Sequence, residues 1–162
     1  MKTLKRISLV FLSICLLIVL SGCTLTPAGD LLPDNSLQSF YEKVSRSQEL
    51  LDTVGDDIYT YWYDCIYNDK YYDDIDIAIG TALIDNEANI EEIEALDAEI
   101  GQLFQKVKDG KHGDKVKAVM TAYSEYYEFV INVSGSFNSY SENLEILKKA
   151  LASAIRELSY EL

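Results

Sequence analysis

Residues 114–160 read DKVKAVMTAYSEYYEFVINVSGSFNSYSENLEILKKALASAIRELSY, and this stretch decides the fold class. Apolar residues recur in it at seven-residue steps, and a second apolar row follows the first at a distance of three residues. The first row is Val116, Tyr123, Val130, Phe137, Leu144, Leu151 and Leu158, and the second is Val119, Tyr126, Val133, Tyr140, Leu147 and Ala154. Such spacing is typical of a helix that interlocks with its neighbours as in a coiled coil. We therefore predict one long helix over residues 114–160.

The tripeptide Ser134-Gly135-Ser136 lies in the middle of this predicted helix. Glycine and two serines disfavour a helix by about 1 kcal/mol or more relative to good helix formers. Because both apolar rows keep their phase across the tripeptide, we favour a continuous helix that bends there. A break near Gly135, which would give four helices in all, is the alternative.

Two further helices are expected before this one. Residues 36–67 carry an apolar row of Leu37, Val44, Leu51, Ile58 and Cys65, and residues 74–108 carry Ile79, Asn86, Ile93, Ile100 and Val107. The row of residues 74–108 contains one amide, Asn86, which we expect at the edge of the row, in water. The alternative is a buried amide with a hydrogen-bond partner, which would fix the register of the helices. Residues 109–113 hold two glycines and read as a turn. The sequence thus predicts an all-α fold, an antiparallel up-down-up bundle of three long helices.

The N-terminus has three parts: a basic start at residues 1–6, an apolar run at residues 7–20, and then Leu20-Ser21-Gly22-Cys23. The apolar run is too short to span a bilayer and is typical of a secretory signal. The last four residues resemble the lipobox of bacterial lipoprotein precursors. This resemblance implies cleavage before Cys23 and a diacylglyceryl thioether with palmitate-type acyl chains on its sulfur. For the helical body we identify no family.

The resemblance implies a signal peptide at 1–22 and lipid on Cys23. Residues 24–35 hold both prolines and no sustained periodicity, so we expect a lipidated tether at 23–35, and the apolar rows predict a helical bundle domain at 36–162. It also implies export and lipid anchoring at the outer face of the cytoplasmic membrane, or at the outer membrane in a Gram-negative source. Of the three cysteines, Cys15 falls in the signal and Cys65 on a predicted core position, so we expect a buried, inert thiol and no internal disulfide.

Charge limits the class of partner. Lys2, Lys5 and Arg6 lie in the first 22 residues and no acidic residue does, so the formal charge of −13 becomes −16 after processing. Such a chain repels nucleic acid and anionic lipid headgroups overall. Five lysines at positions 106–117 nevertheless make the predicted turn locally basic, and that turn is expected beside the membrane-near start of the first helix.

No catalytic or metal-binding pattern stands out. The one histidine, His112, falls in the two-glycine turn and is expected to be solvated, and the aspartates near residue 74 fail the calcium-loop pattern. Pairs such as Glu91 with Glu92 are expected on a solvated face. We therefore predict no cofactor, no metal and a noncatalytic binding or adaptor module. The alternatives are an envelope enzyme that uses carboxylates and a self-associating structural spacer.

Aromatic residues crowd the first connection, with seven in residues 59–72. They either fill the end of the bundle or form a partner surface. A continuous helix 114–160 would also outrun its neighbours and leave a leucine stripe uncovered. We expect the aromatic residues to cover this stripe; the alternatives are a helix that breaks at Gly135 and doubles back, and another chain that binds the stripe. The predicted surface for a protein, peptide or glycan partner is Tyr61, Trp62, Tyr63, Tyr67, Tyr71, Tyr72, Leu151, Ile155 and Leu158.

Overall fold

The computed structural model describes residues 35–162, which contain five α-helices, one 3-10 turn and no strand. The elements are α2 (Ser36–Tyr67), η1 (Tyr71–Asp73), α3 (Ile75–Asp85), α4 (Glu87–Val107), α5 (Gly113–Ile131) and α6 (Phe137–Ser159). The all-α prediction is confirmed, and the prediction of three helices is wrong. Among the helices of residues 35–162, none combines the length and hydrophobicity that crossing a bilayer requires.

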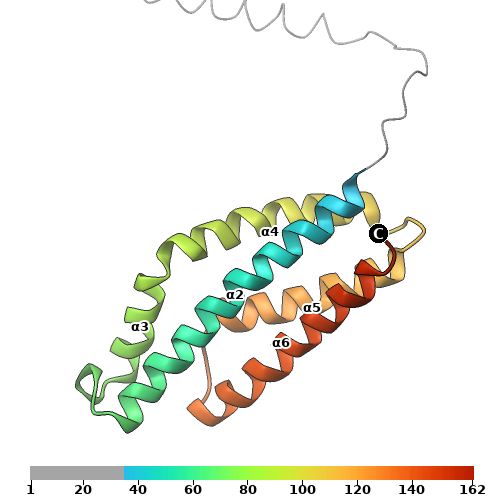
Figure 1. Ribbon diagram of the computed structural model, residues 1–162. Helices are drawn as coiled ribbons and strands as arrows, with labels where there is room; N and C mark the ends of the chain where they lie inside the picture. Colours follow the sequence, from blue (N-terminus) through green and yellow to red (C-terminus); the bar gives the residue numbers. More distant parts are fainter. Residues whose placement is uncertain (1–34) are drawn as a thin grey trace, which may run out of the picture. The chain divides into compact units, whose positions relative to one another are not determined.

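Helix α2 is the axis of the bundle (Figure 1). Helices α3 and α4 return along one side of it, and α5 and α6 form an antiparallel pair that packs against its other side. The start of α2, the α4–α5 turn and the C-terminus therefore meet at one end of the bundle. The α2–α3 and α5–α6 connections lie at the opposite end. Residues 35–162 form one compact unit, which is expected to fold by itself.

The helix predicted over residues 114–160 breaks at Gly135. Helix α5 ends at Ile131, and Gly135 has a φ of 93°, a left-handed conformation that side chains disfavour. Ser136 then caps α6: its hydroxyl accepts from the Ser139 N–H at 3.3 Å, and the Ser139 hydroxyl accepts from the Ser136 N–H at 2.9 Å. Local capping of this kind starts a new helix. The expected continuous helix is therefore wrong, and the alternative break near Gly135 is correct.

Because α6 reverses direction, the expected leucine overhang does not form. Leu151 and Leu158 have no exposed surface and Ile155 is 7% exposed, since all three pack inside the bundle. Helices α5 and α6 each turn their own apolar row toward the core, and the non-helical residues 132–136 between them remove any helical constraint that one row places on the other. Continuity of phase is thus compatible with a reversal of the chain.

The helix predicted over residues 74–108 also breaks, at Asn86, which lies between α3 and α4. Asn86 is 3% exposed, and its Nδ2 donates to Asp57 Oδ2 at 2.8 Å and to the Ala82 carbonyl at 3.0 Å. Its Oδ1 accepts from Asn89 Nδ2 at 2.8 Å. The expectation that Asn86 lies in water is therefore wrong: burial is tolerated because each amide group has a partner. The extra break makes the count five helices instead of four.

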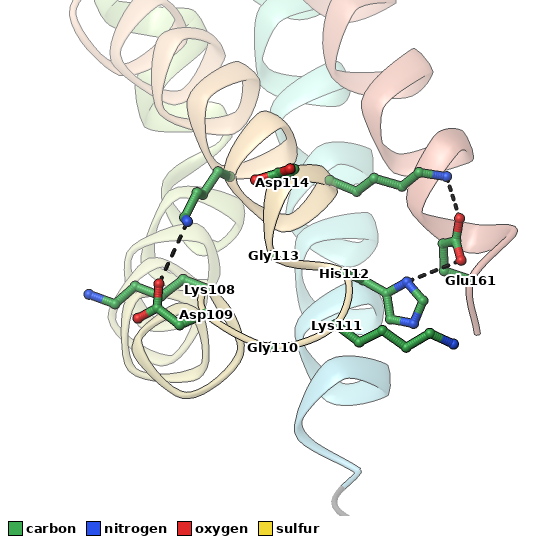
Figure 2. A pocket seen from close by; sticks show the side chains of 10 residues that line it. Lys108, Asp109, Gly110, Lys111, His112, Gly113, Asp114 and Glu161 are labelled. Atoms are coloured by element: carbon green, nitrogen blue, oxygen red, sulfur yellow. Dashed lines mark hydrogen bonds and ion pairs between the residues drawn. The ribbon is translucent and has the colours of Figure 1, made fainter.

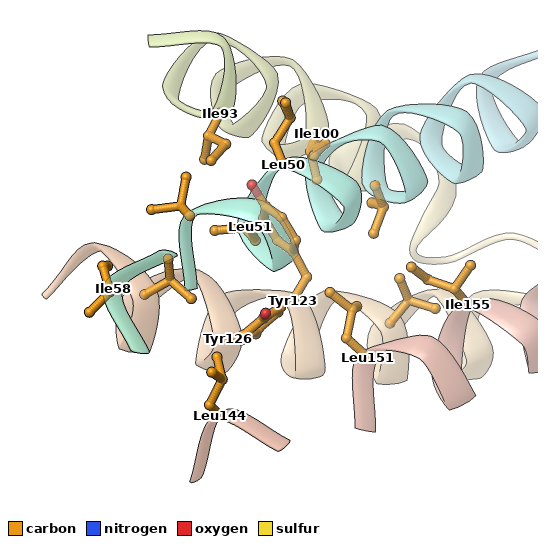
Figure 3. Close-up of a cluster of buried hydrophobic side chains, with 14 of the residues drawn as sticks. Leu50, Leu51, Ile58, Ile93, Ile100, Tyr123, Tyr126, Leu144, Leu151 and Ile155 are labelled. Atoms are coloured by element: carbon orange, nitrogen blue, oxygen red, sulfur yellow. The ribbon is translucent and has the colours of Figure 1, made fainter. Parts of the chain in front are cut away.

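The core lies between α2 and the other four helices (Figure 3). Figure 3 labels Leu50, Leu51 and Ile58 from α2, Ile93 and Ile100 from α4, Tyr123 and Tyr126 from α5, and Leu144, Leu151 and Ile155 from α6. Tyr126 and Tyr140 are fully buried, and their hydroxyls donate to Asp52 at 2.9 Å and to the Gly55 carbonyl at 3.3 Å. These bonds satisfy the buried hydroxyls and tie α5 and α6 to α2.

Two small residues of α2 lie in this core. A Cβ atom on Gly55 would stand 2.8 Å from Leu144 Cδ1, so the missing side chain lets α6 approach α2 closely. Cys65 is a free cysteine, 4% exposed, and burial raises the pKa of its thiol. The prediction of a buried Cys65 is confirmed, and the raised pKa keeps the reactive thiolate scarce.

Candidate functional site

The last turns of α2 carry a row of tyrosines that we call the tyrosine ladder: Tyr59, Tyr63 and Tyr67, with Phe137 of α6 against them. The three tyrosines are four residues apart and so share one face of the helix. Ring centroids are 6.2 Å apart for Tyr59 and Tyr63 and 4.6 Å for Tyr63 and Tyr67. The Phe137 ring stacks on Tyr59 with the ring centroids 5.3 Å apart. Its centroid lies 6.2 Å from that of Tyr63 and 6.1 Å from that of Tyr67.

The ladder becomes more exposed toward the end of the bundle. Tyr59 and Phe137 are half-buried, Tyr63 is 41% exposed and Tyr67 is 58% exposed. The rings are held by one another, so they would lose little rotamer freedom on binding. Rigid, amphipathic aromatic area of this kind is enriched where proteins contact partners. The ladder is therefore the strongest candidate for a partner surface in residues 35–162.

Trp62 lies in the core beneath Phe137 and is not part of the ladder's exposed surface. It is 4% exposed and packs against Phe137 at 6.0 Å and Tyr140 at 5.6 Å between ring centroids. Its Nε1 finds no hydrogen-bond partner in the described part of the protein. The sequence placed Trp62 on the partner surface, but the structure places it in the core, where it anchors the N-terminus of α6.

Tyr61 and Tyr71 lie on the α3 side of α2. Their rings stack with centroids 5.3 Å apart, and the Tyr61 hydroxyl donates to Asp85 Oδ2 at 2.6 Å. The hydrogen bond to Asp85 raises the pKa of Tyr61 to about 12. The Tyr61–Asp85 bond joins α2 to α3, and the Tyr61–Tyr71 stack joins α2 to the turn η1. Both contacts are separate from the ladder. The side chain of Tyr72 lies outside the described part of the structure.

The structure therefore separates the predicted partner surface into three groups. Tyr63 and Tyr67 remain on an accessible face, and Tyr61 and Tyr71 join α2 to the α3 side. Trp62, Leu151, Ile155 and Leu158 are buried. Cys23, the predicted lipid-attachment residue, lies outside the described residues. Sequence reasoning left Tyr59 and Phe137 off the predicted surface, although the four-residue spacing of Tyr59, Tyr63 and Tyr67 was a usable signal.

The connection after the ladder is held in a strained conformation. Asp69, Tyr71 and Asp73 have φ values of 51°, 59° and 57°, in the left-handed region that costs a non-glycine residue about 1–2 kcal/mol. Local bonds offset this cost: Asp64 accepts from Asn68 and Lys70 at 2.6 Å each, and the bond from Lys70 lowers the pKa of Asp64. These hydrogen bonds hold the α2–α3 connection in one conformation next to Tyr67, the last tyrosine of the ladder.

The opposite end of the bundle is basic (Figure 2). The α4–α5 turn and the chain's C-terminal region enclose an open hollow of about 590 Å³, lined by Lys108, Asp109, Gly110, Lys111, His112, Gly113, Asp114, Lys115, Lys117 and Glu161. Glu161 accepts from Lys115 at 2.5 Å, which lowers the pKa of Glu161, and meets His112 Nδ1 at 3.1 Å. His112 was expected to be solvated; its side chain is only 17% exposed, because α6 brings Glu161 back to the turn.

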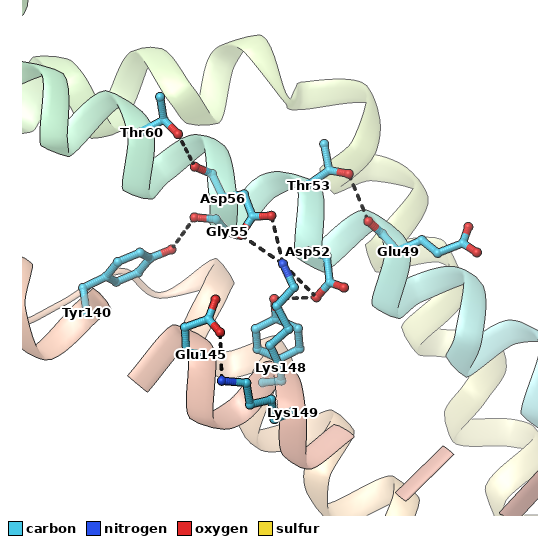
Figure 4. Close-up of polar contacts among 11 residues, drawn as sticks. Glu49, Asp52, Thr53, Gly55, Asp56, Thr60, Tyr140, Glu145, Lys148 and Lys149 are labelled. Atoms are coloured by element: carbon cyan, nitrogen blue, oxygen red, sulfur yellow. Dashed lines mark hydrogen bonds and ion pairs between the residues drawn. The ribbon is translucent and has the colours of Figure 1, made fainter. Parts of the chain in front are cut away.

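A cluster of charges lies between α2 and α6 (Figure 4). Lys148 donates to Asp56 at 2.9 Å and stands 4.0 Å from Asp52. Partial burial raises the pKa of Asp52, although the hydrogen bond from Tyr126 opposes this. A hollow of about 370 Å³ adjoins the cluster, and Asp56 and Glu145 line it from two helices.

Two carboxylates across a hollow are one arrangement that can serve acid-base catalysis. Here Asp56 is held by Lys148, and Glu145 is paired with Lys149 at 3.2 Å. Asp52, whose pKa is raised, is not among the residues that line the hollow. The cluster therefore reads as an interhelical ion pair. Across the described residues, no three His, Cys, Asp or Glu side chains gather to hold a metal ion.

No family model matches this chain, and neither the curated proteins nor the solved structures yielded a match.

Proposed function

We propose that this chain is an exported lipoprotein whose bundle is a noncatalytic binding module, held at the membrane by lipid on Cys23. The tyrosine ladder is its partner surface. The single observation that carries this proposal is the accessible, mutually packed row of tyrosines at the end of α2 farthest from residue 36.

Connectivity supports an outward-facing ladder. Twelve residues, 24–35, separate Cys23 from the start of α2 at Ser36, and they reach at most about 40 Å when extended. Tyr59 and Tyr67 follow Ser36 by 23 and 31 residues, or about 35 and 47 Å along a helix at 1.5 Å per residue. A lipid at Cys23 would join the bundle at its basic end, so the ladder would be at the end of the bundle farther from the anchor along the chain.

A photo-crosslinking amino acid in place of Tyr67 tests the proposal in the source cells. Tyr67 is 58% exposed, so the replacement leaves the core intact. We expect a discrete crosslinked species that contains a protein, peptide or glycan partner. The matched control replaces Tyr160, which is 73% exposed and directly precedes Glu161 of the basic hollow, and it should not give the same species. Identical products from both positions, or none from Tyr67, would contradict the proposal.

A self-associating spacer in the envelope is the competing function within the same class. Crosslinks from Tyr67 to a second copy of this chain would support it. Sedimentation equilibrium of the chain from Thr24 onward separates the two, because a binding module for another partner stays monomeric.

A further inference from the structure

Helix α3 has an unusual composition for a helix that packs against one neighbour. Its sequence is IDIAIGTALID, and apolar residues occur on all of its sides. Only Ala78 and Ala82 are buried, against α2. A helix that is apolar all round is normally covered all round. In Figure 1, α3 lies at the margin of the bundle with only α2 along its length.

The outer face of α3 is apolar and has a shallow depression between two exposed isoleucines. We define it as Ile77, Gly80, Thr81 and Ile84, which are spaced at three, four and seven residues and therefore share one side of the helix. Ile77 is 45% exposed and Ile84 is 73% exposed, the latter among the most exposed large apolar side chains described. A Cβ on Gly80 would meet no atom within 4 Å. The two isoleucines, about 10 Å apart along the axis, therefore flank a low saddle at Gly80 and Thr81.

The charges around this face have one sign. Residues 71–105 contain ten aspartates and glutamates and no lysine, arginine or histidine. Asp76 of α3 and Glu87 and Glu91 of α4 are exposed and have no ion-pair partner among the described residues. Helix α4 begins two residues after α3 ends, so all three carboxylates are close in sequence to the outer face. A second copy of this chain would bring the same carboxylates against them, and an anionic lipid surface would also be repelled. A basic surface is the complement.

We propose that the outer face of α3 docks an amphipathic helix of another protein, with apolar side chains against Ile77 and Ile84 and lysines or arginines beside the flanking carboxylates. A helix fits because the saddle lets its backbone approach while its ridges pass between the two isoleucines. This site is independent of the tyrosine ladder, since α2 separates the two surfaces. It therefore stands whether or not the ladder binds a partner.

The test uses a labelled synthetic peptide of about 18 residues, with leucines at helical spacing and lysines elsewhere. Its binding to the chain from Thr24 onward is followed by fluorescence anisotropy. Gly80→Met fills the saddle, and Gly101→Met is the matched control, because a Cβ on Gly101 also meets nothing within 4 Å. Ile84→Ser removes an apolar contact, and Ile146→Ser is its control, since Ile146 of α6 is 62% exposed.

We expect Gly80→Met and Ile84→Ser to raise the Kd about tenfold or more, whereas both controls leave it unchanged. A peptide with glutamates in place of the lysines should not bind, and added salt should weaken the lysine peptide. Equal binding by all four variants would show attraction by charge alone and overturn the proposal. Dimers of the wild-type chain that Ile84→Ser dissociates would assign the face to a second copy and overturn it too.

Discussion

Replacing Asn86 by isoleucine gives the sharpest test of how the α3–α4 break is held. The amide is 3% exposed and makes three hydrogen bonds, two as donor and one as acceptor. Isoleucine restores the apolar row that the sequence shows and favours one continuous helix. If the row alone governed this region, Asn86→Ile would stabilise the protein.

The structure predicts the reverse. The bond to the Asp57 carboxylate contributes about 1.5–3 kcal/mol, and the two neutral bonds about 1 kcal/mol each. Asp57 and Asn89 are only half-buried, so water replaces part of what they lose. Burying isoleucine regains about 1–2 kcal/mol. We expect a net loss of about 2 kcal/mol, which for a domain of this size lowers Tm by roughly 5–10 °C.

Urea unfolding of the chain from Thr24 onward, followed by circular dichroism, measures this loss. Asn143→Ile makes the same chemical change at an exposed position of α6 and should leave stability nearly unchanged. A double-mutant cycle with Asp57→Ala isolates the Asn86–Asp57 bond, and a coupling near zero would refute our account of it. An Asn86→Ile protein as stable as the wild type would refute the whole argument.

Three further predictions concern the anchor, the reversal and the buried tyrosines. Cys23→Ser should abolish metabolic labelling by a fatty-acid analogue, because a hydroxyl cannot replace the thiol as acceptor; label on the variant would end the lipoprotein interpretation. Gly135→Ala should lower the free energy of unfolding in urea by about 1–2 kcal/mol, because φ is 93°, whereas Gly101→Ala on α4 should raise it by about 1 kcal/mol. Burial raises the pKa of three tyrosines above its ordinary value of 10, so above pH 10 the unfolded chain releases their protons and the folded one does not. Stability should then fall by about 1.4 kcal/mol per pH unit for each of Tyr123, Tyr126 and Tyr140, with a shallower slope in Tyr126→Phe, as read by tyrosinate absorbance and circular dichroism.

Helix ends were predictable where composition and periodicity agree. The helix predicted over residues 36–67 matches α2, and the two-glycine turn at residues 109–113 matches the α4–α5 connection. Both ends of α2 lie within two residues of the ends of its apolar row, so the residues that favour a helix locally are also the ones that pack in the core. Antiparallel packing followed from the short turn and is also observed.

The breaks at Asn86 and Gly135 were not predictable from the apolar rows because each break depends on a particular hydrogen-bonding arrangement. Asn86 stays buried because its amide is paired on every side, and one of its partners is Asp57, 29 residues earlier in the sequence. Ser136 begins α6 through a reciprocal bond with Ser139, which a count of apolar positions does not register. A capping search for serine pairs at three-residue spacing would have strengthened the case for the alternative break.

The partner surface depended on the same reversal. A continuous helix would have carried Leu151, Ile155 and Leu158 beyond the bundle as an uncovered stripe. Reversal at Gly135 turns that stripe into the core and places Phe137 at the start of α6, against Tyr59, Tyr63 and Tyr67. Without Phe137 the three rings would keep their contacts with one another but would lose the aromatic ring that packs against all three. The tyrosine ladder therefore has its full aromatic packing because the chain turns back at Gly135, and the same glycine that sets the helix count also positions the proposed binding site.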